Sequence, residues 1–198
     1  MIAKRLFDLF FTLPAFLILM PFFAAIALWI KLDSAGPVFF KQERVGLNGR
    51  NFRILKFRTM CVDAEAIGRQ ITVGEDPRIT RSGKFLRKSK LDELPQLLNV
   101  VRGEMSLVGP RPEVPRYVAL YSLSQRERIL SVPPGITDFA SIEFRDENAI
   151  LGSAMDPEQA YIREVMPIKL ALCERYVAQR SLWGDILLIL RTFKAILG

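Results

Sequence analysis

Two adjacent carboxylates, Asp92 and Glu93, follow a run of basic residues in the stretch KSKLDELPQ. A carboxylate can attack phosphorus as a nucleophile, accept a proton or hold a divalent cation, and two neighbouring carboxylates can divide these tasks. Arg87 precedes the pair, and Arg111 follows it in the stretch GPRP. Because guanidinium groups neutralise phosphate oxygens, this combination predicts phosphoryl transfer with Mg²⁺ held at the carboxylates.

The same pair also has a purely structural interpretation. Carboxylates at the start of a helix complement the helix dipole, and each contributes ~0.3–1 kcal/mol. This alternative requires no ligand, and the local pattern alone leaves it open.

The composition narrows the chemistry. The 198 residues include no histidine, which excludes Ser-His-Asp and Cys-His nucleophilic sites and every histidine-liganded metal. The two cysteines, Cys61 and Cys173, lie far apart and lack the spacing of a zinc site. The oxygen ligands that remain favour a hard cation, Mg²⁺ or Mn²⁺.

The net charge of +7 is concentrated in one part of the chain. Residues 41–102 contain 14 basic and 7 acidic residues, which leaves 14 of each sign elsewhere. Such a basic surface is either a solvated face or a contact for an anionic partner, such as a phosphate ligand or acidic phospholipids. Nucleic acid is not expected as a partner, because the sequence carries no nucleic-acid-binding motif.

An apolar segment near the N-terminus is long enough to enter a membrane. Residues 9–30 (LFFTLPAFLILMPFFAAIALWI) form 22 uncharged positions, and a straight helix of that length would extend ~33 Å. Pro21 removes a backbone donor in the middle, and each half is too short to cross alone. Lys4, Arg5 and Lys31 flank the segment, which favours a bent, re-entrant hairpin with both ends on the cytoplasmic side. The alternative, a cleaved signal peptide, is disfavoured by the length of the apolar run.

The residues after this segment predict a β-hairpin and then a basic helix. Residues 38–45 and 52–57 have strand composition and flank an Asn-Gly turn signal, so the hairpin presents Lys56 and Arg58 as candidate substrate-binding cations. Farther along, Arg81, Lys84 and Lys88 share one helical face with Phe85 and Leu86 beside them. That mixture suits the headgroup layer of an anionic membrane.

The carboxylate pair is expected at the start of a short amphipathic helix. Apolar residues between 91 and 101 follow helical spacing until Gly103 ends the pattern. Either Ser89 is the N-cap with Asp92 as its capping-box partner, or Asp92 itself is the cap and Pro95 lies in the first turn. Both readings place the carboxylates at a helix N-terminus.

The remaining sequence predicts turns followed by helices. The stretches GPRP and VPPGIT are typical of rigid turns, and Asp156 with Pro157 predicts the start of a helix. The last helix is expected over Leu182–Leu197, where apolar and basic residues alternate. It lies either in the membrane interface or over the core.

The order of these motifs resembles the bacterial sugar transferases called monotopic phosphoglycosyl transferases, which begin the assembly of polyprenol-linked glycans. The resemblance runs over residues 4–137 through KRLFDLF, GPVFFKQERVG, KFRTM, DPRITRSGKFLR, LDELPQLLNVVRGEMSLVGPRP and PPGIT. It implies Asp92 as a covalent nucleophile and Mg²⁺ ligand, with Glu93 beside it as base or metal orienter. It also implies a re-entrant helix whose break lies at Pro21.

The same resemblance implies basic substrate contacts at Lys56, Arg87 and Arg111, and members of this length lack the membrane-spanning extension of larger ones. The chain departs from the family pattern at two places. Many members continue from PGIT into Gly-x-Ala-Gln-x-Asn-Gly, whereas this chain reads PGITDFASIEFRDEN, and Lys90 stands where serine often precedes LDELPQ. The first departure concerns the sugar and nucleotide pocket, and the second adds a charge beside the dyad.

The sequence and the resemblance together predict a mostly helical α+β fold. A re-entrant membrane helix at residues 1–32, one β-hairpin and several amphipathic interface helices surround an active site at the membrane surface. The helix forms a single functional unit with a cytosolic catalytic domain at residues 33–198.

The predicted enzyme is monotopic on the cytoplasmic face of the bacterial inner membrane. It transfers a phospho-sugar from a UDP-sugar to polyprenyl (undecaprenyl) phosphate and releases UMP by a ping-pong route. Its expected partners are these two substrates and membrane phospholipids, with a homodimer left open. The alternatives are a non-catalytic membrane-surface module that needs no Mg²⁺, and a direct transferase without a covalent intermediate.

Overall fold

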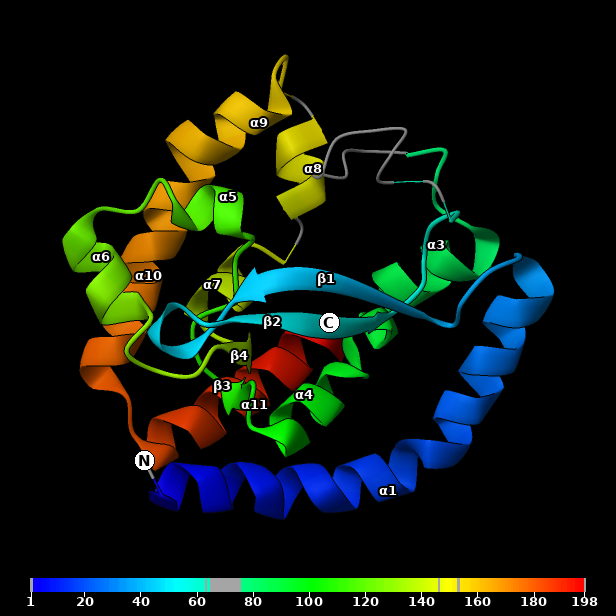
Figure 1. Ribbon diagram of the computed structural model, residues 1–198, viewed down its shortest axis with the longest axis horizontal. Coiled ribbons are helices and arrows are strands. Elements are labelled where there is room, and N and C mark those ends of the chain that lie inside the picture. The colour runs from blue at the N-terminus through cyan, green and yellow to red at the C-terminus, as the bar shows by residue number, and fades with distance from the viewer. Residues whose placement is uncertain (1, 63, 65–75, 146, 153, 198) are drawn as a thin grey trace.

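A computed structural model describes residues 2–62, 64, 76–145, 147–152 and 154–197 of the chain. Helices predominate, and two small sheets lie among them (Figure 1). The helices are α1 (Ile2–Asp33), α3 (Arg81–Lys88), α4 (Gln96–Arg102), α5 (Pro115–Val118), α6 (Leu123–Ile129), α7 (Phe139–Glu143), α8 (Glu147–Gly152), α9 (Pro157–Ala160), α10 (Met166–Gln179) and α11 (Leu182–Leu197). The strands are β1 (Phe39–Val45), β2 (Asn51–Phe57), β3 (Ser106–Val108) and β4 (Gly135–Thr137). This architecture confirms the mostly helical α+β expectation.

Helix α1 bends between its two halves and curves around the remainder of the molecule (Figure 1). It continues through Pro14 and Pro21 as one helix, so the break expected at Pro21 is absent and the helix is bent instead. A proline removes one backbone hydrogen bond and crowds the preceding turn, which bends a helix while the bonds on either side persist.

In the described ranges, α1 is the one helix long and apolar enough to cross a membrane by length and composition. Only 6% of its most apolar window is buried, so α1 is not a core helix. An exposed apolar surface of this length is compatible with the expected membrane segment.

Both halves of α1 are fastened to the rest of the fold. Near the start, Lys4 Nζ lies 2.9 Å from Asp185 Oδ2 of α11, and Arg5 donates to the carbonyl oxygens at the end of α4. In the second half, Ile30 is fully buried in a cluster with Phe57 of β2 and Leu86 of α3. The membrane-type helix is thus packed directly on the elements that carry the site.

The predicted β-hairpin is confirmed. Strands β1 and β2 pair antiparallel from Phe39 opposite Phe57 to Val45 opposite Asn51. The tight connection uses Asn48 and Gly49, both at positive φ (54° and 75°), a region that these two residue types tolerate.

A second sheet was not predicted. Strands β3 and β4 pair in parallel, with Ser106 opposite Gly135 and Val108 opposite Thr137. Of the two stretches interpreted as rigid turns, GPRP follows β3, whereas the last three residues of VPPGIT form β4 itself. The two segments are so close that a Cβ atom on Gly135 would overlap the backbone of Gly109. Three-residue strands carry no readable periodicity, and the pairing depends on this close backbone approach.

The carboxylate pair lies in a 3₁₀ turn, Leu91–Glu93, and α4 begins after Pro95 and ends at Gly103 (φ 83°). The capping-box reading was wrong, because Ser89 ends α3 and donates its hydroxyl to the Phe85 carbonyl at 2.8 Å. Asp92 makes no cap bond to the described backbone either. Pro95 is itself the N-cap of α4, so it precedes the first turn instead of lying in it, and neither predicted side-chain cap forms.

The later helices agree with their sequence signals. Asp156 caps α9 by accepting from the backbone of Glu158 and Gln159, and Pro157 is the first residue of that helix. In α11, Trp183 and Phe193 are 69% and 60% exposed. The helix does cover the core, because Leu188 is buried in a cluster with Val108 and Tyr176. The exposed side chains leave the rest of α11 open to the membrane interface as well.

Candidate active site

The fold gathers the carboxylate pair with three of the four predicted substrate-binding cations. Lys56 comes from β2, Arg87 from the end of α3, and Arg111 from the loop after β3. All three cations act electrostatically on Asp92, and Lys56 and Arg111 also contact Glu93. These residues are separated by up to 55 positions in the sequence, so their assembly is a property of the tertiary fold.

Glu93 is fully engaged in ion pairs. Arg111 makes two hydrogen bonds to its carboxylate, Nη1 to Oε2 at 3.0 Å and Nη2 to Oε1, and Lys56 Nζ lies 2.8 Å from Oε1. Burial alone would raise the pKa of Glu93, but Arg111 and Lys56 outweigh it and hold this pKa well below the usual range. Glu93 is therefore a permanent anion with both oxygens occupied.

Asp92 has the opposite environment. Its side chain is buried, with 8% of the residue exposed, and within the described ranges no group donates a hydrogen bond to its carboxylate. Burial raises the pKa of Asp92, the charge of Lys56 lowers it in part, and the adjacent Glu93 raises it again. The two carboxylates thus differ in kind: Glu93 is committed to cations, whereas Asp92 is free to react or bind.

Arg87 faces the site with most of its hydrogen-bonding capacity unused. Its Nε donates to Thr59 Oγ1 at 2.9 Å, and no other side-chain partner occurs among the described residues. Burial lowers the pKa of Arg87, and the charge of Asp92 opposes that shift. The guanidinium is available for an anion that approaches Asp92.

Arg58 lies elsewhere. It is 4% exposed, and its Nη2 donates to Ser34 O at 2.7 Å and Ser34 Oγ at 2.9 Å, while Nη1 donates to the Ala35 carbonyl. The orphan carbonyls at the C-terminal end of α1 occupy this guanidinium. The predicted substrate contact therefore finds no support in its position, and Arg58 is not part of the site assembled around the dyad.

The sequence analysis did not predict a second cluster of charged side chains, centred on Glu113, near the cluster around Asp92 and Glu93. Arg44 donates to the Pro112 carbonyl at 3.0 Å, and its Nη1 lies 3.7 Å from Glu113 Oε2. Tyr161 donates its hydroxyl to Glu113, and Lys169 Nζ lies 3.6 Å from the same carboxylate. Burial lowers the pKa of Arg44, and Glu113 offsets this. The available signal was the alternation of β1, which turns Gln42 and Arg44 to its less exposed face.

The loop that carries Arg111 is held from two sides. Arg44 binds the Pro112 carbonyl on one side, and Asp138 accepts the backbone N–H of Arg111 at 3.2 Å on the other. A parallel strand pair supports its base through Gly135 N to Pro110 O at 3.0 Å. The cation that binds Glu93 therefore comes from a rigid loop.

The two departures from the family pattern touch each other. Lys90 adopts a left-handed backbone conformation (φ 56°), and its Nζ donates to the Arg145 carbonyl at 3.1 Å. Arg145 belongs to the stretch after PGIT, so the residue before LDELPQ is linked to the segment that replaces the usual pattern. Lys90 therefore contacts that segment, and it forms no ion pair with Asp92 or Glu93.

Asp92 is the one carboxylate of the described site that is free to bind a hard cation such as Mg²⁺. Among the described residues, no three acidic or cysteine side chains cluster as a metal site. Mg²⁺ needs only one or two carboxylates when phosphate oxygens and water complete its octahedron. Because both Glu93 oxygens are occupied and Asp92 is free, Asp92 is the residue that fits as the protein ligand.

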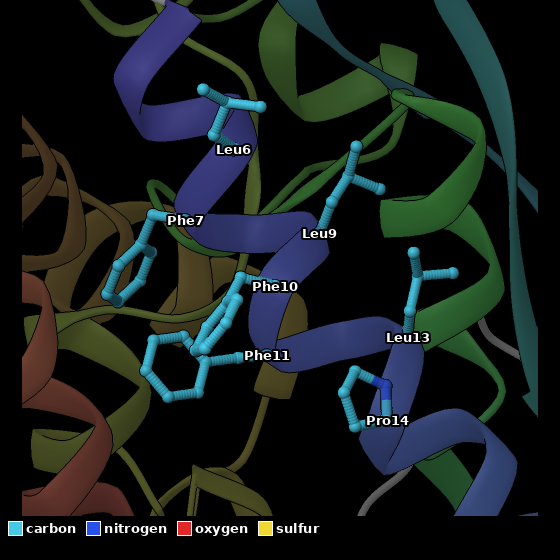
Figure 2. A pocket seen from close by; sticks show the side chains of 7 residues that line it. All are labelled: Leu6, Phe7, Leu9, Phe10, Phe11, Leu13 and Pro14. Carbon is cyan, nitrogen blue, oxygen red and sulfur yellow. The ribbon is translucent and has the colours of Figure 1, made fainter.

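A purely apolar hollow lies away from the dyad, on the first half of α1 (Figure 2). Its lining residues all belong to this helix and are Leu6, Phe7, Leu9, Phe10, Phe11, Leu13 and Pro14. A surface without polar groups offers nothing to a phosphate and suits hydrocarbon.

Comparisons with known proteins show which proteins this chain resembles. The family model described as bacterial sugar transferase matches residues 1–198. The undecaprenyl-phosphate glucose phosphotransferase of Komagataeibacter xylinus is 41% identical over 98% of this chain and 36% of that protein. A UDP-N-acetylgalactosamine-undecaprenyl-phosphate N-acetylgalactosaminephosphotransferase of Aeromonas hydrophila is 38% identical over 98% of this chain and 43% of its own length.

A third relative is closer in length. The exopolysaccharide production protein ExoY of Sinorhizobium fredii is 34% identical over 98% of this chain and 85% of its own. The chain therefore spans roughly two fifths of the two phosphotransferases above and most of this shorter relative.

Proposed function

The chain belongs to the bacterial sugar transferase family, and we propose that it transfers a phospho-sugar from a UDP-sugar to undecaprenyl phosphate, releasing UMP. One observation carries the proposal: Asp92 is a buried carboxylate without a described hydrogen-bond partner, facing Lys56, Arg87 and Arg111. That arrangement suits attack on a diphosphate whose charge the cations neutralise. The names of the relatives support the acceptor.

In the first step, an Asp92 oxygen attacks the β-phosphorus of the UDP-sugar. A bond forms between that oxygen and phosphorus, the bond from phosphorus to the bridging oxygen breaks, and UMP leaves with the bridging oxygen. Arg87 and Arg111 hold the non-bridging oxygens, because planar guanidinium groups match phosphate geometry. Burial favours this step, since a weakly solvated carboxylate is the stronger nucleophile.

In the second step, a phosphate oxygen of undecaprenyl phosphate attacks the same phosphorus. The new phosphoanhydride bond replaces the bond to Asp92, whose carboxylate is regenerated, and undecaprenyl diphosphate sugar leaves. At neutral pH the acceptor phosphate is already largely ionised, so the step needs little help from a base.

Glu93 fits the role of an organiser better than that of a base. Its low pKa makes it a weak proton acceptor, and its two oxygens hold Lys56 and Arg111 in fixed positions. Donor phosphates would meet these cations at positions that Glu93 has already fixed.

Asp92 would hold Mg²⁺, which would supply further positive charge to neutralise the donor diphosphate. The residues support this without a dedicated cage, because Lys56, Arg87 and Arg111 carry the remaining positive charge around the dyad.

For location, we propose a monotopic arrangement at the cytoplasmic face of the bacterial inner membrane. The exposed, apolar and bent α1 would enter the bilayer as a re-entrant helix, and residues 33–198 would form the catalytic domain with it as one unit. Exposed aromatic residues on α11 and the cationic face of α3, with Arg81, Lys84 and Lys88, would contact the headgroups.

The test of the function is UMP release over a panel of UDP-sugars with undecaprenyl phosphate and Mg²⁺. At least one donor is expected to yield UMP together with a lipid-linked product, and the panel identifies the sugar. If no donor yields UMP while the protein still binds anionic vesicles, a non-catalytic surface module becomes the better description.

Replacing Lys56 by methionine is expected to move the acid limb of kcat/KM against pH to higher pH. Asp92 must be ionised to attack, burial raises its pKa, and Lys56 counteracts that rise. Without the ammonium group the pKa rises further, so activity is lost at a higher pH as the solution is acidified. The control, Lys84→Met, removes a cation from the exposed face of α3 and should leave the limb in place. An unshifted limb in the Lys56 variant would contradict the electrostatic role.

The topology predicts that Pro21→Leu converts part of the population to a spanning form. Leucine restores the missing backbone donor and straightens α1, which as a continuous helix is long enough to cross. In a Cys61→Ser background, where the remaining Cys173 is buried, a cysteine introduced at Ile2 or at Leu123 should be shielded from external thiol reagents in intact cells. Pro21→Leu should expose the Ile2 site alone. External labelling at Ile2 in the parent protein would disprove the re-entrant arrangement.

A further inference from the structure

We propose that Asp138, which no sequence motif marks as part of the site, is a positioning residue for this transfer reaction and acts through Arg111. The inference rests on the proposed function, because it assigns a residue that sets the geometry of the donor-phosphate contact. Asp138 follows directly after the family stretch PPGIT, at a position where the chain departs from the usual glycine.

Asp138 is a completely buried carboxylate, with 0% of the residue exposed. A buried anion is costly unless it is hydrogen-bonded or paired. Four contacts meet this need: Ser141 donates both its N–H and its hydroxyl, each at 2.7 Å, Arg111 donates its backbone N–H at 3.2 Å, and the Cys173 thiol lies at 3.6 Å.

The two carboxylate oxygens divide these contacts. Oδ1 accepts both bonds from Ser141 and so caps the start of α7, whereas Oδ2 faces the Arg111 N–H and the Cys173 thiol. A helix cap needs only one side-chain oxygen. Oδ2 is therefore free to accept a second hydrogen bond, and its donor is the backbone N–H of Arg111, whose side chain binds Glu93.

The fold explains why these two residues meet. Strands β3 and β4 are parallel neighbours, so their carboxyl ends emerge at the same edge, one leading to Arg111 and the other to Asp138. Gly109 and Gly135 let the two backbones approach without side chains between them. The Arg111 side chain also reaches back to the Ile136 carbonyl at 3.5 Å, close to the limit for a hydrogen bond.

The consequence is a chain of contacts from a buried anchor to the reacting centre. Asp138 fixes the Arg111 backbone, Arg111 makes paired hydrogen bonds to Glu93, and Glu93 is adjacent to Asp92. A guanidinium that binds a transferring phosphoryl group has to be placed within a fraction of an ångström, because small displacements lower the rate strongly. Loss of the Oδ2 contact should therefore affect the donor site while the α7 cap survives.

Two substitutions separate the cap from the contact with Arg111. Asp138→Asn and Asp138→Ser each retain an oxygen for the Ser141 N–H, and both residue types are good caps. In the asparagine variant an amide N–H₂ meets the Arg111 N–H, and in the serine variant the side chain is too short to serve both partners. Ser141→Ala and Cys173→Ala are the matched controls, since each removes another Asp138 contact and leaves Arg111 untouched.

The measurements are steady-state constants for donor and acceptor with the full-length protein, together with thermal unfolding. We expect Asp138→Asn and Asp138→Ser to lower kcat/KM for the donor by about tenfold, with an unchanged KM for the acceptor, and both controls to stay within about twofold. In an Arg111→Lys background, Asp138→Asn should cost no more than about a further twofold, because residues that act through one another are not additive.

Three results would overturn the positioning role. The first is an additive loss of kcat/KM in the variant that combines Arg111→Lys with Asp138→Asn. The second is an equal loss in Ser141→Ala, and the third is failure of both Asp138 variants to fold. Each result would mean that Asp138 has a structural role only. The parent protein keeps the two proposals separate: absence of UMP release from every donor contradicts the transferase function, whereas normal release with unaffected Asp138 variants contradicts only this inference.

Discussion

Asp92→Asn is expected to abolish turnover while making the protein more resistant to heat. A carboxamide is a poor nucleophile and a weak ligand for Mg²⁺, so kcat should fall by about 10⁴-fold or more, as for other nucleophile substitutions. The change is nearly isosteric, and no described group donates a hydrogen bond to the carboxylate that is lost. The fold should therefore tolerate it.

The thermal effect follows from the direction of the pKa shift. Folding raises the pKa of Asp92 above the ordinary value of 3.8, chiefly through burial. An acid whose pKa is higher in the folded state destabilises the fold once the pH exceeds its unfolded pKa. Asparagine removes this penalty, so Tm should rise by a few degrees at pH 7, with about 2–4 °C per kcal/mol in a chain of this size. The gain should vanish as the pH approaches 4.

The covalent step can be observed by omitting the acceptor. Parent enzyme with Mg²⁺ and the correct UDP-sugar should release about one UMP per active site and add the mass of a phospho-sugar to the peptide that contains Asp92. Asp156→Asn is a suitable control, since asparagine caps α9 as well as aspartate does and the adduct should persist. Release that requires undecaprenyl phosphate, with no trapped adduct, would instead indicate direct transfer and a metal-binding role for Asp92.

Arg111→Lys should lower kcat/KM by about 100-fold or more, the cost of removing one preorganised donor from a transition-state site. Lysine keeps the charge but cannot make the two parallel hydrogen bonds that Arg111 forms with Glu93. Burial would then oppose the ionised form of Glu93, so a second consequence is a lower Tm. Steady-state kinetics and thermal unfolding measure the two effects separately.

The matched control is Arg116→Lys, on α5, where an exposed arginine faces Glu158. Exposed ion pairs contribute little, so its kinetics should be close to those of the parent. Arg87→Lys is expected to behave like Arg111→Lys, because the Nε bond to Thr59 and the planar group are both lost. Near-normal kinetics in both site variants would show that these arginines are surface charges or membrane contacts.

The parts of the site that the sequence predicted are those with a local signature. The Asn-Gly turn and the basic face of α3 each depend on residues within about one turn of one another, and both formed as expected. The carboxylate pair was expected at a helix start, and it lies in the 3₁₀ turn before α4 without either predicted cap. Lys56 could be placed for the same reason, because a hairpin fixes the direction of its side chains.

Arg58 shows where such reasoning stops. Two positions after Lys56 on an ideal strand, it should face the same way, but β2 ends at Phe57 and Arg58 turns to the end of α1. The direction of the Arg58 side chain depends on how α1 packs on β2, which the local sequence does not show. Arg44, Glu113 and Asp138 were missed for a related reason, since their partners come from distant segments that no local pattern joins.

Under the proposed function, the packing of α1 on β2 and α3 would also determine how the protein meets its lipid acceptor. Ile30 lies against Phe57 and Leu86, the immediate neighbours of Lys56 and Arg87. If α1 rests in the bilayer, these two cations are held at a fixed height above the hydrocarbon, where the phosphate of a long-chain acceptor already lies. The lipid then need not be extracted, and its capture becomes a search in two dimensions, governed by surface density rather than by concentration in solution.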